Sequence, residues 1–346
     1  MATRIRHITS AFVILSVLLL VSSSLGVVTS TETKQNEAEV AQMYQRWLVE
    51  NRKNYNGIGE KERRFKIFKD NLNFIYEHNS VQNRTYEVGL TRFADLTNDE
   101  FQAIYLRKKM ERSKDSVNLR DICTKKEMFC LMKSIGERKA QLYQSKIKET
   151  VIKTGELISL SEQELVDCDR GFVNAGCDGG IMNYAFQFIM KTGGIETDQD
   201  YPYNANDLGL CNADKNNNTR VVVTIDGYED VPRDDEKSLQ KAVAHQPVSV
   251  AIEASSQAFQ LYKSGVMTGT CGISSDHGVV VVGYGSSSGE DYWIICNSWG
   301  SNWGESGYVK LQRNINDSFG KCGVAMMASY PTKSSFPSSF DLLSEI

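Results

Sequence analysis

The sequence has no block of basic residues and, after residue 26, no apolar run long enough to cross a membrane. Its 39 Lys and Arg residues are outnumbered by 43 Asp and Glu residues, which gives a formal net charge of -4. A mildly acidic chain without a basic patch has little to attract nucleic acid. A transmembrane helix needs about 20 consecutive apolar residues. We therefore expect neither a nucleic-acid-binding protein nor a membrane protein.

Paired metal ligands are also missing. The eight cysteines are loosely spaced, and only His277 among the four histidines lies near a cysteine cluster. A zinc site normally has ligands two to four residues apart. We therefore expect no metal site, and we interpret the cysteines as components of disulfides.

Residues 1–26 have the pattern of a secretory signal peptide. Arg4 and Arg6 precede an apolar stretch from Ala11 to Val21, and small residues follow. A signal peptide is removed on secretion, and its presence implies that the protein passes through an oxidising compartment. The mature protein is expected outside the cell or in a vacuolar or lysosome-like compartment. Three matches to the glycosylation acceptor pattern fit that route: Asn83, Asn217 and Asn316.

With 346 residues, the chain is long enough for two lobes and further segments. Residues 36–110 read as helical, because apolar residues recur at steps of three and four between Glu60 and Asn79. The same run carries polar residues at fixed offsets, which an ordinary amphipathic helix does not require. The complete motif is Glu60-x3-Arg64-x3-Phe68-x2-Asn71-x3-Ile75-x3-Asn79.

This motif resembles the prodomain helix signature of papain-like cysteine proteases at every position. The segment Gly89-x-Thr91-x-Phe93-x-Asp95 resembles the second prodomain motif of that family, with Thr91 where asparagine is usual. From Gly155 to Pro331 the resemblance continues almost without a gap. It implies an α+β, papain-like two-lobe fold, with a helical lobe, an antiparallel β-barrel-like lobe and a preceding helical inhibitory prodomain.

Local patterns in the second half agree with that fold. Ser161 and Glu164 are placed to form a capping box at a helix start. Four runs rich in β-branched or aromatic residues read as strands: 248–252, 279–284, 292–295 and 308–311.

Half of a catalytic site is evident in two motifs, Asp276-His277-Gly278 and Asn297-Ser298-Trp299-Gly300. A cysteine protease needs a thiolate beside an imidazole, and a third group that orients the ring. The resemblance implies that His277 is the base, that Asn297 is the orienting amide, and that Trp299 shields their hydrogen bond from water. It implies no cofactor.

The resemblance also implies further site residues. Cys168 is expected to pair with Cys211, and Cys271 with Cys322, each disulfide contributing about 2–4 kcal/mol. The Cys177 segment resembles the loop that forms one wall of the substrate cleft. Apolar pocket walls imply a preference for an apolar side chain two residues before the cleaved bond. The expected pocket residues are Gly179, Gly180, Ile181, Met182, Ala251, Ser275, Asp276, Trp299 and Met327.

The nucleophile motif itself is missing. The family carries Gln-x-Gly-x-Cys-Gly-Ser-Cys-Trp about eighteen residues before the position of Gly155. Counting back without gaps places Glu137 at the nucleophile, Ser134 at the disulfide cysteine and Leu131 at the oxyanion glutamine. No tryptophan occurs between Trp47 and Trp293.

Residues 113–154 therefore do not resemble the family, and the first lobe is expected to be incomplete. In the family, the helix that carries the nucleophile is buried in the core of the first lobe. Charged residues such as Glu137 could not take its place there, because an unpaired buried ion costs several kcal/mol. Cys130 is a weak candidate for a nucleophile, since no glycine or glutamine beside it could form an oxyanion hole. Cys123 or Cys130 could instead pair with Cys177, while the role of Cys296 stays open.

Three functions remain open. The chain is a cysteine endopeptidase homologue that is inactive for lack of its nucleophile, a prodomain-based inhibitor of active relatives, or the product of a decayed or mis-spliced gene. The expected partners are polypeptide substrates or a related cysteine protease, and the chain is expected to be a monomer. The expected divisions are 1–26 signal peptide, 27–112 prodomain, 113–154 divergent segment, 155–331 peptidase-like domain and 332–346 tail.

Overall fold

The structure is a computed structural model that describes residues 37–106 and 159–333, except 172, 208 and 215–221. Three predicted features lie outside the described residues: the signal peptide, the divergent segment 113–154 and the acceptor Asn217. Of the predicted tail 332–346, only residues 332 and 333 are described. The chain divides into two units, one ending at Asp70 and the other beginning at Asn71. None of the described helices combines the length and the apolar character needed to cross a membrane.

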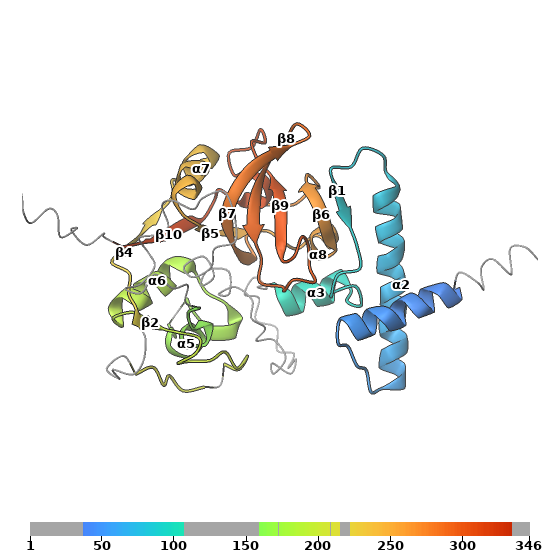
Figure 1. The fold of residues 1–346 in the computed structure, drawn as a ribbon, viewed down its shortest axis with the longest axis horizontal. Coiled ribbons are helices and arrows are strands. Elements are labelled where there is room, and N and C mark those ends of the chain that lie inside the picture. Colours follow the sequence, from blue (N-terminus) through green and yellow to red (C-terminus); the bar gives the residue numbers. More distant parts are fainter. Residues whose placement is uncertain (1–36, 107–158, 172, 208, 215–221, 334–346) are drawn as a thin grey trace, which may run out of the picture. The chain divides into compact units, whose positions relative to one another are not determined.

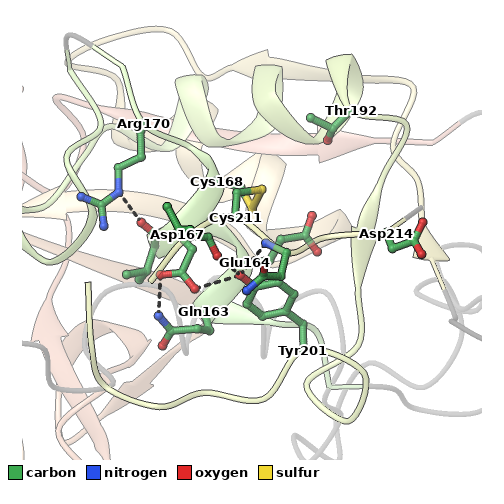
Figure 2. The surroundings of a disulfide bond; sticks show 12 residues. Gln163, Glu164, Asp167, Cys168, Arg170, Thr192, Tyr201, Cys211 and Asp214 are labelled. Atoms are coloured by element: carbon green, nitrogen blue, oxygen red, sulfur yellow. Dashed lines mark hydrogen bonds between the residues drawn. A yellow bond between two sulfur atoms is a disulfide. The ribbon is translucent and has the colours of Figure 1, made fainter. Parts of the chain in front are cut away.

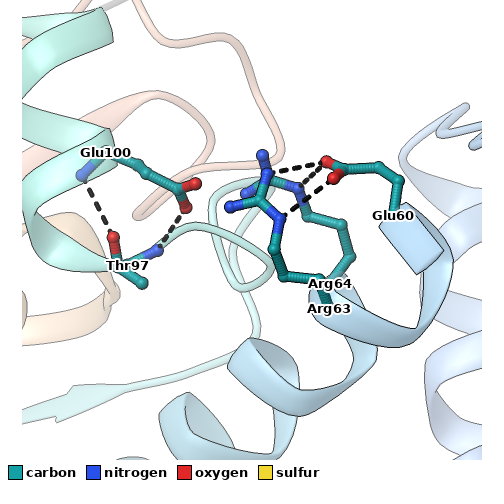
Figure 3. Close-up of polar contacts among 5 residues, drawn as sticks. All are labelled: Glu60, Arg63, Arg64, Thr97 and Glu100. Atoms are coloured by element: carbon teal, nitrogen blue, oxygen red, sulfur yellow. Dashed lines mark hydrogen bonds and ion pairs between the residues drawn. The ribbon is translucent and has the colours of Figure 1, made fainter.

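The first unit is built on two helices, one over residues 37–50 and the N-terminal half of α2 (Ile58–Ser80). Tyr44 and Trp47 of the first helix pack their rings against Phe68 at 5.0 and 5.5 Å between centroids. Glu60, in the first turn of α2, accepts hydrogen bonds from Arg63 and, at 2.7 Å, from Arg64 (Figure 3). The Glu60 and Arg64 positions of the motif are therefore an ion pair at the start of the helix.

The second unit begins with the C-terminal half of α2, and here the two motif asparagines bind the chain that follows. Asn79 and Val88 exchange two hydrogen bonds, Nδ2 to the carbonyl at 2.9 Å and N–H to Oδ1 at 3.1 Å. Asn71 is buried and donates to the carbonyls of Ala94 and Leu96 at 2.8 and 2.9 Å. These polar positions fix the path of residues 88–96 along the helix.

Helix α3 (Asn98–Tyr105) follows, and its start has a complete capping box. Thr97 accepts the backbone N–H of Glu100, and the Glu100 carboxylate accepts the backbone N–H of Thr97 (Figure 3). This reciprocal arrangement satisfies two N–H groups that the first turn of a helix leaves without partners.

One eight-stranded sheet runs through the second unit in the order β1-β6-β9-β8-β7-β5-β10-β4 (Figure 1). The four predicted strands lie within β5, β7, β8 and β9. Neighbouring strands are antiparallel except β6 and β9, which are parallel, so the sheet is mixed, and the predicted papain-like fold is confirmed. The strand bounds are β1 (Tyr86–Val88), β4 (Gly227–Asp230), β5 (Val248–Ile252), β6 (Tyr262–Met267), β7 (His277–Ser287), β8 (Glu290–Cys296), β9 (Tyr308–Gln312) and β10 (Ala328–Thr332).

The helical lobe contributes α5 and α6 with a small second sheet of β2 and β3. Leu165, Phe186 and Ile189 belong to its buried cluster, which Val280 and Cys296 join from β7 and β8. The remaining bounds are α5 (Glu162–Cys168), η3 (Gly176–Asp178), α6 (Met182–Lys191), β2 (Ile195–Glu196), β3 (Val222–Val223), α7 (Glu236–His245), α8 (Gln257–Gln260) and η4 (Lys321–Gly323).

The start of α5 differs from its prediction in one respect. The Ser161 hydroxyl caps the helix by accepting the N–H of Glu164 at 2.9 Å. The Glu164 carboxylate, however, accepts the N–H of Glu196 at 2.7 Å, and the N–H of Ser161 donates to the carbonyl of Glu196. The capping box is therefore not closed, because β2 supplies partners for both groups.

Two disulfides lie within the described residues. One joins Cys168 to Cys211, next to a network in which the Tyr201 hydroxyl donates to Asp167 at 2.8 Å (Figure 2). The other joins Cys271 to Cys322. Cys177 is also disulfide-bonded.

Candidate active site

His277 and Asn297 come together from the ends of two paired strands. His277 is the first residue of β7, and Asn297 follows directly after β8. His277 Nε2 lies 2.8 Å from Asn297 Oδ1, and both residues are 3% exposed. The N–H of Asn297 donates to the carbonyl of Gly307 at 2.9 Å, which anchors the backbone beneath the amide. The site therefore has a buried imidazole held by a buried carboxamide.

The hydrogen bonds of Asn297 also determine where the proton of the imidazole lies. Asn297 Oδ1 accepts the backbone N–H of Ser298 at 2.8 Å, so this atom is the amide oxygen and not the nitrogen. Since it is an acceptor, Nε2 of His277 must carry the proton in the neutral ring. Nδ1 is then the basic nitrogen, the one that can take a proton from a reacting group.

Trp299 closes one side of this pair. Its ring stacks on His277 at 4.7 Å between centroids with an interplanar angle of 22°, and the indole is 1% exposed. Phe259 and Trp303 meet it edge-on at 5.7 and 4.9 Å. A rigid aromatic wall of this kind excludes water from the hydrogen bond between His277 and Asn297, which strengthens that bond.

Residues that precede the peptidase-like region complete the aromatic wall. Phe93 and Phe101 meet Trp299 edge-on at 5.3 and 5.2 Å. Arg92 donates to the Trp299 carbonyl at 3.3 Å. The sequence motif contains Phe93, but nothing in the sequence indicates that Phe101 and Arg92 also contact Trp299.

Asp276 precedes His277 in the chain, and the pKa of its carboxyl is raised. Its Oδ1 accepts the N–H of Ala254 at 2.8 Å. Burial raises the pKa of Asp276 to about 6, although the Ala254 N–H and the neighbouring His277 oppose this effect. The carboxyl therefore titrates in the mildly acidic range, close to the ordinary pKa of a histidine.

The expected pocket residues lie on two sets of elements. Ala251, in β5, pairs with Gly278, and its N–H donates to the carbonyl of Met327 at 3.0 Å. The side chain of Met327 is 40% exposed, and Ser275 is exposed in the loop before β7.

Gly179 and Gly180 lie on the other set, between η3 and α6, followed by Ile181 and Met182. Gly179 has φ 94°, and a Cβ at Gly180 would lie 2.5 Å from Asn174 Oδ1. That oxygen accepts the N–H of Ile181 at 2.8 Å. The segment therefore follows a path that requires glycine at these two positions.

The nucleophile side of the site falls outside the described residues, including positions 131, 134 and 137 and the candidates Cys123 and Cys130. Cys296 is described, and its side chain is buried in the cluster with Leu165 and Val280. In the described part of the chain, no three His, Cys, Asp or Glu side chains gather as metal ligands would. The expected acceptors Asn83 and Asn316 are both exposed.

Comparison with known proteins identifies the architecture. Residues 144–332 match the papain family cysteine protease family, and residues 44–101 match the cathepsin propeptide inhibitor domain. The chain belongs to the papain family of cysteine proteases. Its fold is papain-like, with a helical prodomain before the peptidase region.

The similar proteins include plant enzymes of the RD21 type. The chain is 76% identical to Probable cysteine protease RDL2 of Arabidopsis thaliana, covering 100% of this chain and 99% of the relative. It is 63% identical to Probable cysteine protease RD21C of the same species, covering 97% of this chain and 77% of the relative.

Among solved structures, the proform of the ragweed pollen allergen Amb a 11 has a TM-score of 0.69 at 35% identity, covering 88% of each chain. A recombinant stem bromelain precursor has a TM-score of 0.70 at 36% identity, covering 86% of this chain and 100% of that one. Both are precursors, so the likeness extends to the prodomain.

Proposed function

We propose that this chain is a papain-family cysteine protease homologue that does not itself hydrolyse peptides. The observation that carries the proposal is the absence of the nucleophile motif from the sequence. That motif ends in Cys-Trp, and no tryptophan occurs between Trp47 and Trp293. No segment between the prodomain and His277 can therefore supply the motif.

The geometry of the remaining half explains why this loss matters. His277 and Asn297 are arranged to take a proton from a thiol and to stabilise the resulting imidazolium. Neither residue can form the covalent acyl intermediate on which thiol-dependent hydrolysis depends. In a comparable hydrolytic triad, removal of the nucleophile lowers kcat by about 10⁶. The oxyanion glutamine is missing as well, which removes a further source of catalysis.

Two comparisons support the loss of a segment. The match to the peptidase family begins at residue 144, inside the divergent segment 113–154. The alignment with RDL2 extends over 364 positions, whereas the chain has 346 residues, so RDL2 has residues that this chain lacks. These facts support an incomplete first lobe. We propose the division into prodomain 27–112, divergent segment 113–154 and peptidase-like domain 155–331, although the family match begins before the last boundary, at residue 144.

We also propose a secretory route for this chain and an apolar substrate pocket. A signal peptide over residues 1–26 would direct the chain into the secretory pathway, towards the cell exterior or a vacuolar compartment. Glycans would be attached at Asn83, Asn217 and Asn316. Where peptide binding survives, the pocket between Ile181 and Ala251 would take an apolar side chain.

A second candidate function is inhibition of active relatives through the prodomain. It is favoured by the contacts of Phe93 and Phe101 with Trp299, because a family member with the same aromatic wall offers the same docking site. In this case the purified full-length chain would slow peptide hydrolysis by an active papain-family protease. An unchanged rate at an excess of this chain would rule out that function.

A third candidate is a gene whose catalytic segment was lost by decay or mis-splicing. The abrupt end of family-like sequence near Val117 and its return near Gly155 favour it. Sequencing the transcript across codons 110–155 tests this candidate. A spliced message that encodes the motif would show that the present sequence is not the mature product.

Hydrolysis of a fluorogenic dipeptide with an apolar penultimate residue tests the main proposal. The chain is acid-treated, supplied with a thiol reductant and compared with a His277→Ala variant. We expect equal, background rates for both. Turnover that disappears in the variant and is blocked by a thiol alkylator would overturn the proposal, and mass mapping of the alkylated cysteine would identify the nucleophile.

A further inference from the structure

Two buried serines lie opposite each other in the sheet, and neither belongs to the catalytic site. Ser249 in β5 is 2% exposed, and Ser329 in β10 is 1% exposed. Neither side-chain oxygen makes a hydrogen bond within the part of the chain that the structure describes. In the unfolded chain each hydroxyl is hydrogen-bonded to water, so burial without a new partner is unfavourable. Buried hydroxyls of this kind therefore indicate a bound group that satisfies them.

The pairing of β5 with β10 sets the distance between the two serines. They are directly opposite each other in this antiparallel pair, and opposite residues present their side chains on the same face. The N–H of Ala251 donates to the carbonyl of Met327 at 3.0 Å, which makes these two residues a hydrogen-bonded pair. Such pairs recur at every second position, so Ser249 and Ser329 form the next one, with Cα atoms about 5.5 Å apart. The two hydroxyls are therefore close neighbours that do not bond each other.

The neighbouring strands show that this face is turned towards the helical lobe. Ser249 pairs on its other side with Val280 of β7, which belongs to the buried cluster of that lobe. Ser329 pairs on its other side with Asp230 of β4. The Oδ1 atom of Asp230 accepts a hydrogen bond from Asn183 Nδ2 of α6 at 2.6 Å. Since α6 packs against both β4 and β10, the two hydroxyls are enclosed between the sheet and the helical lobe.

The helical lobe offers mainly apolar groups at this place. Ala185 and Phe186 of α6 belong to the same cluster as Val280, and the carboxamide nitrogen of Asn183 already donates to Asp230. The group that satisfies the serines must therefore be small, and it must donate as well as accept. An O–H···O hydrogen bond is about 2.8 Å long, so one water molecule can join two oxygens up to about 5.6 Å apart. Water also needs at least two polar partners in a buried site, and the two hydroxyls supply them.

We propose that Ser249 and Ser329 hold one water molecule between their hydroxyls, which links β5 to β10 on the face towards α6. The water accepts a hydrogen bond from one serine and donates one to the other, so both hydroxyls gain a partner. Ala251 lies two residues along β5 on the same face. The water is therefore one residue pair behind the wall of the proposed substrate pocket. Its site is formed by the sheet, and it does not depend on whether the chain hydrolyses peptides.

Magnetic relaxation dispersion of water nuclei tests this site in the full-length chain, because it counts the water molecules that stay bound for longer than the protein takes to tumble. We expect the native chain to hold one more such water than the variant Ser249→Ala/Ser329→Ala, which lacks both hydroxyls. The matched control is Ser287→Ala, which removes an exposed hydroxyl at the end of β7. It should hold as many waters as the native chain. An equal count in the native chain and the double variant would overturn the proposal.

A crystal structure of the native full-length chain gives a second test, which is independent of whether the double variant folds. We expect a water oxygen about 2.7–3.0 Å from both Ser249 Oγ and Ser329 Oγ. Electron density without that water would contradict the proposal, whether the two hydroxyls then bond each other or a different protein group.

Discussion

The contact between Gln260 and the prodomain can be tested by the substitution Gln260→Glu, which replaces the side-chain amide nitrogen by an oxygen and leaves the size of the side chain nearly unchanged. Gln260 is fully buried in α8, and its Nε2 donates to the carbonyls of Phe93 and Leu96. Both carbonyls keep another donor, since Asn71 donates to Leu96 and the N–H of Leu96 donates to the carbonyl of Phe93 at 3.1 Å. A protonated glutamate supplies one O–H in place of two N–H donors. We therefore expect a loss of about 1 kcal/mol when the new carboxyl is protonated.

A larger loss is expected at neutral pH. An ionised carboxylate facing two carbonyl oxygens in a buried site is strongly disfavoured, so the folded-state pKa of the new glutamate lies above the unfolded value of about 4.3. A raised folded pKa means that stability is lost as the pH rises. While the buried carboxyl stays protonated, each pH unit above 4.3 costs about 1.4 kcal/mol. Between pH 5.0 and 7.5 the additional loss is at most about 3.4 kcal/mol on the same relation.

Urea unfolding of the full-length chain, followed by tryptophan fluorescence, measures this difference against the native chain at each pH. Gln260→Met lacks the amide and does not titrate, so its loss of about 1–3 kcal/mol should be the same at both pH values. Gln45→Glu places the same charge on an exposed position of the first helix and should change little. Equal destabilisation by Gln260→Glu at pH 5.0 and 7.5 would refute the reasoning, because the side chain would then not be buried against the two carbonyls.

Further predictions concern the site and its disulfide. Asp276→Asn should stabilise the chain above pH 6 and have no effect below pH 4, because burial raises the pKa of Asp276 to about 6 and its charged form is disfavoured. The free energy of unfolding should rise by about 1 kcal/mol, since partial exposure reduces the roughly 3 kcal/mol that the pKa shift alone implies. Urea unfolding midpoints at pH 4 and pH 7.5 measure this difference. A lower midpoint for the variant at pH 7.5 would contradict the prediction. Paired replacement of Cys168 and Cys211 by serine should cost about 4 kcal/mol, because the bridge closes a loop with a sequence separation of 43. Thermal unfolding measures that cost, and an unchanged midpoint would show that the bridge does not constrain the unfolded chain.

The strands and the prodomain helix could be predicted because local sequence determines them. Residues 248–252 and 308–311 have the β-branched and apolar composition of strands, and β5 and β9 cover them. β6 was not predicted, since Lys263, Ser264 and Gly265 are poor strand formers, and its parallel pairing with β9 arises only from the tertiary arrangement.

The site was predicted only as far as its motifs extend. His277 and Asn297 could be placed because both stand in recognisable sequence contexts, and the structure brings them together. Gln260 and Phe101 have no such context, and their contacts with the prodomain and with Trp299 depend on residues distant in sequence. The partner of Glu164 could not be predicted either, because it lies in β2.

The central claim is that the chain lacks the nucleophile segment and retains the rest of the peptidase site. The most direct test replaces residues 113–154 with the corresponding segment of an active relative that carries the Gln-x-Gly-x-Cys-Gly-Ser-Cys-Trp motif. The rate of dipeptide hydrolysis is then compared between the native and grafted chains. The account predicts background turnover by the native chain, and turnover by the grafted chain that His277→Ala abolishes. Turnover by the native chain, or a folded grafted chain that stays inert, would contradict it.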